Sequence, residues 1–148
     1  MLEFILILFE LYFPSIFYKT TNISPDFLLL LILYISFKYT RVNVLVIAFL
    51  CGFIKDILIS YSWFGLIALL VTIFAYMASH LKKINSVSIN YIFSSLLIFF
   101  YFYFYFLFQF SYSFIFCLEL SIVKTLMTIL IYFVIKVIYS RSYNYFEK

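Results

Sequence analysis

Lys55 and Asp56 are the residues of this chain that fit their apolar surroundings least, because they interrupt a long hydrophobic run. Gly52 precedes Asp56 by four positions, so a helix would place both on one face. A small residue one turn from a carboxylate lets another helix approach closely and contact that carboxylate. Two interpretations stay open: a conformational or partner-binding hinge, or an ordinary interfacial charge at the end of a helix.

Four other charged residues lie in or near apolar segments. Glu3 and Glu10 are seven positions apart and share one helix face, and Glu10 is expected to face protein or to be uncharged. A proton relay through Glu10 is the less favoured alternative. Glu119 stands near the start of the last apolar segment, and Lys124 is expected to reach back to a carboxylate there. Structural pairing is the favoured interpretation for both.

The chain offers no set of residues suited to catalysis. A nucleophile, a base and an orienting group cannot be assembled from it. The only glycines are Gly52 and Gly65, too few for a phosphate-binding loop. Cys51 and Cys117 lack the histidine and carboxylate neighbours that a metal site needs. We therefore expect no enzymatic activity, no metal and no cofactor.

The composition indicates a membrane protein. Of 148 residues, 68% are hydrophobic and 11% are charged, and the mean hydropathy is +1.17. A soluble domain of this size is about half apolar, so lipid must cover most of this surface. The net charge of +4 does not point to nucleic acid, because the basic residues are scattered at the ends of apolar runs, where they set orientation in the membrane.

The hydrophobic pattern predicts an all-α bundle of six short transmembrane helices in one integral membrane domain, 1–148. We expect the helices at about 3–18, 26–38, 42–55, 62–80, 89–110 and 117–139. The first is read as a retained span rather than a cleaved signal sequence. The second and third have about 13 residues each, or roughly 20 Å of helix. A five-span alternative fuses them, but it places Lys38 and Arg41 in mid-membrane at a cost of several kcal/mol.

Charge placement favours six spans with both termini in the cytoplasm. The cytoplasmic side then carries six basic residues and the opposite side carries two. This distribution follows the positive-inside rule. The six are Lys38, Arg41, Lys82, Lys83, Arg141 and Lys148, and the two are Lys19 and Lys55.

An aromatic run, FFYFYFYFLFQF, fills positions 99–110. We interpret it as a helix that faces lipid or packs against its neighbours. A role in stacking a ligand is the less favoured alternative. Any buried tyrosine in this run would need a partner for its hydroxyl group.

Residues 25–76 carry a resemblance to a known family. Pro25-Asp26 precedes a leucine run, Arg41-Val42-Asn43 follows a basic turn, Gly52-x-x-x-Asp56 closes the third segment, and Phe64-Gly65-Leu66-x-Ala68-Leu69 opens the fourth. In order and spacing these elements resemble the MreD family, the small integral membrane component of the bacterial rod-shape machinery. Lys55 departs from the family pattern, which more often has an apolar or small residue there. The aromatic second half is a further departure.

The resemblance implies a non-enzymatic protein of the cytoplasmic (inner) membrane that helps to organise lateral peptidoglycan synthesis. Its expected partners are an MreC-like bitopic protein, the actin-like MreB, and the glycosyltransferase and transpeptidase of elongation. Candidate partner-binding or structural residues are Pro25, Asp26, Arg41, Asn43, Gly52, Asp56 and Gly65. The alternative function is that of a small-vitamin-binding membrane subunit of an energy-coupling-factor transporter, in which the aromatic fifth helix would stack a flat ring.

Overall fold

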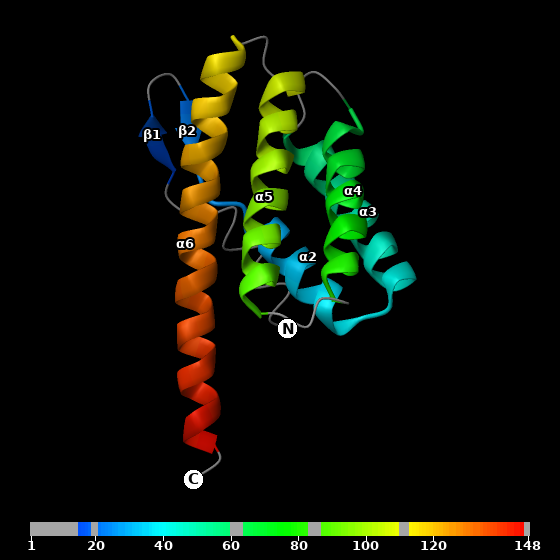
Figure 1. The fold of residues 1–148 in the computed structure, drawn as a ribbon. Coiled ribbons are helices and arrows are strands. Elements are labelled where there is room, and N and C mark those ends of the chain that lie inside the picture. Colours follow the sequence, from blue (N-terminus) through cyan, green and yellow to red (C-terminus); the bar gives the residue numbers. More distant parts are fainter. Residues whose placement is uncertain (1–14, 19–20, 60–63, 83–86, 110–112, 147–148) are drawn as a thin grey trace.

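The computed structural model describes residues 15–18, 21–59, 64–82, 87–109 and 113–146. Five helices and a small hairpin form this part of the chain (Figure 1). The elements are β1 (Ile16–Tyr18), β2 (Thr21–Ile23), α2 (Phe27–Lys38), α3 (Arg41–Ile59), α4 (Leu66–Leu81), α5 (Val87–Gln109) and α6 (Phe114–Phe146).

Helix α2 is the central element of the core. It has 12 residues, and nearly all of them are buried. The apolar residues of α2 are distributed around the helix rather than along one face, as expected for a helix enclosed by other helices. In Figure 1 it begins near mid-height in the bundle and ends beside the start of α3. Because α2 packs on α3, α4 and α6, its first turn lies inside the protein rather than at the bundle's end.

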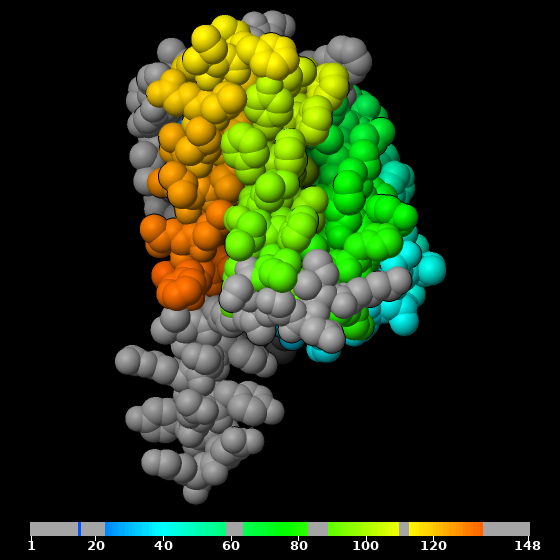
Figure 2. Space-filling view, viewed as in Figure 1, coloured from blue at the N-terminus to red at the C-terminus, as the bar shows by residue number. Residues whose placement is uncertain are grey.

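The other helices form two antiparallel pairs around α2. Helix α3 packs along α4, helix α5 packs along α6, and α4 contacts α5 and so joins the pairs, as Figure 2 shows for α4, α5 and α6. The ends of α2 and α4 and the starts of α3 and α5 lie at one end of the bundle, toward which α6 also runs (Figure 1). We call this the basic end, because Lys38, Arg41 and Lys82 lie there. The opposite end holds the end of α3, the start of α4, the end of α5 and the start of α6.

Among the described residues, two helices are long and apolar enough to cross a membrane, at Ile89–Gln109 and Phe114–Val134. The apolar helices α2 and α4 are shorter, while α3 has 19 residues, or about 28 Å of rise. Large apolar side chains cover the outside of the bundle, as on α3, where Val42, Val46, Leu50, Ile54, Ile57 and Leu58 are all exposed. This surface suits a lipid solvent.

Helix α5 divides its aromatic residues between two faces. Tyr101, Phe102 and Phe106 are buried in the core, whereas Phe100 and Phe104 are exposed and stack on each other. The run at 99–110 therefore both packs and faces outward.

Helix α6 packs inward through small polar residues. Ser121, Thr125 and Thr128 are buried, and each hydroxyl donates to a backbone carbonyl of α6 four residues earlier. Such back-bonding satisfies the hydroxyl within its own helix, so these positions allow close packing without needing a partner on another helix.

The predicted helix at 3–18 is wrong where the structure describes it, and 1–14 lies outside the described residues. Ile16–Tyr18 form strand β1, which pairs antiparallel with β2, with Ile16 opposite Ile23. Aromatic and β-branched residues on both strands favour extended backbone. The five later helices lie where the sequence predicted them, but α3 continues to Ile59 rather than 55, and α6 runs to Phe146 rather than 139.

Candidate functional site

Asp26 performs two tasks at the start of α2. Its carboxylate accepts a hydrogen bond from the backbone N–H of Leu29 at 3.4 Å and so caps the helix. The other carboxylate oxygen pairs with Nζ of Lys55 on α3 at 2.8 Å. The side chain of Asp26 is 3% exposed and that of Lys55 13%. This ion pair therefore joins α2 to α3 in a setting largely shielded from solvent.

Asp56, the next residue of α3, points to a different helix. Its carboxylate accepts hydrogen bonds from the backbone N–H groups of Ile67 at 3.2 Å and Ala68 at 2.8 Å. These N–H groups belong to the first turn of α4, where a helix lacks internal acceptors and carries partial positive charge. Gly65, the N-cap residue of α4, has no side chain to supply a cap. Asp56 provides that cap from another helix.

Gly52 allows this contact. A Cβ atom at Gly52 would lie 2.7 Å from the Cα atom of Ala68 and 3.3 Å from the Cβ atom of Val71. The backbone of α3 thus meets α4 one turn before Asp56 reaches the α4 N-terminus. Gly52 and Asp56 share one face of α3, and that face is directed to α4 of the same chain.

Lys124 brings α5 and α6 to the same region. Its ammonium group lies 4.9 Å from the ring centroid of Phe102 and 5.7 Å from those of Tyr105 and Phe106, all on α5. Aromatic faces at this distance attract a cation. Helix α6 also packs on α2, whose first turn is capped by Asp26. We call the four charged residues Asp26, Lys55, Asp56 and Lys124 the polar cluster.

The polar cluster contains two carboxylates and two ammonium groups, so its formal charge balances. Its members come from α2, α3 and α6, and they contact the start of α4 and the aromatic residues of α5. A buried charge is costly unless it is paired and hydrogen-bonded. Through these contacts the cluster links all five helices, and the charges of Asp26, Lys55 and Asp56 are used within the chain.

The structure brings together only some of the residues singled out in the sequence. Asp26, Gly52 and Asp56 converge, with Pro25 buried beside Asp26 and Gly65 at the start of α4. Arg41 and Asn43 lie apart, exposed at the start of α3.

Arg41 and Lys38, two cations of the basic end, have aromatic neighbours of their own. The Arg41 guanidinium lies 5.8 Å from the Tyr76 ring centroid. Lys38 likewise lies over Tyr34 and Tyr39. These residues are separate from the polar cluster and occupy the basic end.

Sequence reasoning missed two contacts of the polar cluster. The pairing of Lys55 with Asp26 was not foreseen, although both are charges in apolar surroundings and of opposite sign. The aromatic residues around Lys124 were not foreseen as its neighbours either, and the density of rings at 99–110 was the available signal.

The arrangement suits packing rather than reaction chemistry. Within the described part of the chain, no group of three histidine, cysteine, aspartate or glutamate side chains could hold a metal ion. The Asp56 carboxylate accepts two backbone hydrogen bonds, and Asp26 is held by Lys55 and Leu29. Carboxylates fixed in this way act as structural acceptors.

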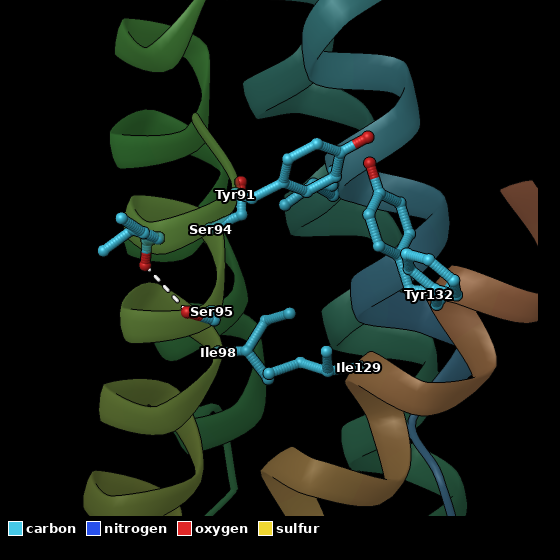
Figure 3. Close-up of a pocket in the computed structure, with 9 residues that line it drawn as sticks. Tyr91, Ser94, Ser95, Ile98, Ile129 and Tyr132 are labelled. Carbon is cyan, nitrogen blue, oxygen red and sulfur yellow. Dashed lines mark hydrogen bonds between the residues drawn. The ribbon is translucent and has the colours of Figure 1, made fainter. Parts of the chain in front are cut away.

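A cavity of about 390 Å³ lies between α5 and α6, away from the aromatic half of α5 (Figure 3). Its lining includes Tyr91, Ser94 and Ile98 of α5 and Ile129 and Tyr132 of α6, with Leu33 of α2. None of the aromatic residues at 99–110 lines it. The ring-stacking site suggested for a vitamin-binding subunit thus has no counterpart in this cavity.

Comparison with known families decides the classification. The sequence model of the family described as rod shape-determining protein MreD matches residues 1–142. The chain belongs to the MreD family. The match covers nearly all of the chain and confirms the resemblance seen in residues 25–76. MreD-family proteins are rod shape-determining proteins of the membrane, and the apolar helices described above agree with that setting. No curated protein and no solved structure matches the chain.

Proposed function

We propose that this MreD-family chain is a non-enzymatic, multi-pass component of the elongation complex in the bacterial cytoplasmic membrane. In this role it helps to organise lateral peptidoglycan synthesis by binding an MreC-like bitopic protein and the elongation glycosyltransferase and transpeptidase, and it acts together with MreB. The observation that carries the proposal is the family match over residues 1–142.

The six-span topology with both termini in the cytoplasm is part of this proposal. Lys38, Arg41 and Lys82 share the basic end of the bundle, and basic residues concentrate on the cytoplasmic side of membrane proteins. The basic end would then face the cytoplasm, where MreB lies. The opposite end, with the start of α4 and the start of α6, would face outward.

The polar cluster supports the proposed role by fixing the shape of the bundle. Asp26, Gly52 and Asp56 make their contacts inside the chain, so we assign them a structural part in the function. Partner helices would then bind the apolar flanks, such as the outer face of α3 with Val46, Leu50 and Ile54, each more than half exposed. Helices in lipid associate by packing such complementary surfaces.

A depletion experiment in host cells tests the proposal. Loss of the chain is expected to abolish normal cell shape, and the wild-type gene supplied in trans should restore it. The Asp56→Leu variant should restore shape poorly, because it disturbs the bundle, whereas Leu126→Ala, at an exposed position of α6 outside the α3 face, serves as a matched single-site control for expression and insertion. Normal shape and normal lateral wall synthesis after complete depletion would contradict the proposal.

A further inference from the structure

The cavity between α5 and α6 has the features of a lipid site. Its volume of about 390 Å³ is within the range of small-molecule pockets. Five of the nine lining residues are aliphatic residues or phenylalanine, with Leu33 of α2 as one wall. The polar residues in it are serines and tyrosines, and the Ser95 hydroxyl already donates to the carbonyl of Ile92 (Figure 3). An apolar chain would fit this lining, and a polar metabolite would not.

The extent of the cavity distinguishes an acyl chain from a partner helix. On α5 the lining residues run from Tyr91 to Ile98, which is about 10 Å along the helix axis. A transmembrane helix is about 10 Å wide and packs along a span of about 30 Å. The cavity is therefore too short to accommodate the packing surface of a transmembrane helix. A segment of one flexible hydrocarbon chain matches it.

Charge at the nearby end of the bundle indicates the headgroup. Lys38 follows the lining residue Leu33 by five positions in α2, about 8 Å further toward the basic end. Lys82 is exposed at the end of α4, just before α5 begins. The carboxylates of the described residues are Asp26, Asp56 and Glu119, and none belongs to this end.

The tyrosines mark the level at which chain and headgroup would meet. Tyr91 and Tyr132 pack edge to face with ring centroids 6.2 Å apart, and their hydroxyl groups point toward the same region in Figure 3. Tyrosine prefers the boundary between hydrocarbon and headgroups, where its ring is apolar and its hydroxyl is wet. Both tyrosines line the cavity, and Tyr91 is the lining residue of α5 nearest to the basic end.

We propose that the α5–α6 cavity binds one acyl chain of an anionic phospholipid whose headgroup is held by the cations of the basic end. The apolar lining selects the chain, and Lys38 and Lys82 select the negative headgroup. Basic surfaces between transmembrane helices recognise anionic lipids in this way. The inference rests on the membrane location of the family and does not depend on which proteins the chain binds.

The proposal is tested by photolabelling of the full chain in nanodiscs. The probes are phosphatidylglycerol and phosphatidylcholine that carry the same diazirine-bearing acyl chain at low mole fraction in unlabelled phosphatidylcholine. Phosphatidylglycerol should label peptides containing residues 91–98 and 129–133 several-fold more strongly than phosphatidylcholine does, since each lysine near an anionic lipid contributes a factor of about five. Equal labelling by both probes, or labelling spread evenly over all exposed helices, would overturn the proposal.

Variants separate the two parts of the site. Ile129→Trp fills the cavity and should abolish labelling there by either probe, whereas Leu130→Trp, at an exposed position outside the lining, should leave it unchanged. Lys38→Gln with Lys82→Gln changes only exposed side chains and should remove most of the preference for phosphatidylglycerol. The assignment would be refuted by undiminished labelling in Ile129→Trp or by an unchanged lipid preference in the double lysine variant. It would also be refuted if residues of the cavity crosslinked to a helix of a co-purified protein.

Discussion

The carboxylate of Asp56 lies 2.8 Å from the backbone nitrogen of Ala68, so a side chain of α3 caps the helix that follows it. The contact is possible because Gly52, one turn earlier, lets the backbone of α3 meet Ala68. One face of α3 thus combines the close approach of two backbones at Gly52 with the polar contact made by Asp56. Substitutions at the two positions test these features separately.

Replacement of Asp56 is expected to destabilise the protein in a graded manner. Asp56→Leu leaves the N–H groups of Ile67 and Ala68 buried without this acceptor, at about 1–3 kcal/mol for each group. Asp56→Asn keeps one acceptor oxygen and should lose only about half as much. Unfolding in detergent micelles by titration with a denaturing detergent measures the difference. Equal losses for both variants would argue against a polar contact.

Gly52→Ala should destabilise the α3–α4 pair by about 1–3 kcal/mol, because overpacking forces the backbones apart. The closest atom is the Cα atom of Ala68, so the second substitution Ala68→Gly should not rescue the variant. The control is Leu50→Ala, because the Leu50 side chain lies on the same helix and is 53% exposed. A Gly52→Ala protein that unfolds like the wild type would show that the two backbones are not in tight contact.

Gly65 is expected to resist substitution for a different reason. Its φ angle is +92°, and a Cβ atom there would meet nothing within 4 Å. The cost of a side chain is thus about 1–2 kcal/mol of backbone strain rather than a clash. Gly65→Asn should be milder than Gly65→Leu, because asparagine tolerates left-handed backbone better. Thermal unfolding of the two purified variants tests this ordering, and a more stable Leu variant would reverse the explanation.

The ion pair between Asp26 and Lys55 should show strong coupling. Asp26→Ser keeps an N-cap group for α2 but leaves Lys55 without this partner, and Lys55→Met leaves the carboxylate without its cation. Each single change should cost about 3 kcal/mol, whereas the double variant should cost less than either, because it removes both buried charges. A double-mutant cycle on unfolding free energies provides the measurement. Additive losses would mean that the pair contributes no coupling.

Local signals in the sequence predicted the helices well where they were strong. Pro25 and Asp26 mark the start of a helix, and the prediction of 26–38 agrees closely with α2 at Phe27–Lys38. The predicted end of α3, at 55, is too early, because two charges such as Lys55 and Asp56 are typical of a helix terminus. Asp26 and the first turn of α4 stabilise these charges, so α3 continues to Ile59.

The polar cluster was predictable only in part. The spacing of Gly52 and Asp56 pointed to a helix that packs closely and meets a carboxylate, but it could not name that helix as α4 of the same chain. Asp26 and Lys55 are 29 positions apart, and no local pattern links residues at that separation. Their pairing follows from where α2 begins inside the bundle, which is a property of the tertiary fold.

The measurement that most directly tests the account is gentle-detergent purification of the tagged chain from native membranes, with co-purifying proteins identified by mass spectrometry. The account predicts recovery of an MreC-like bitopic protein together with cell-wall synthases, and reduced recovery with Asp56→Leu compared with Asp56→Asn at equal membrane levels. Recovery of paired ATPases and a coupling subunit, with no protein of cell-wall synthesis, would contradict it.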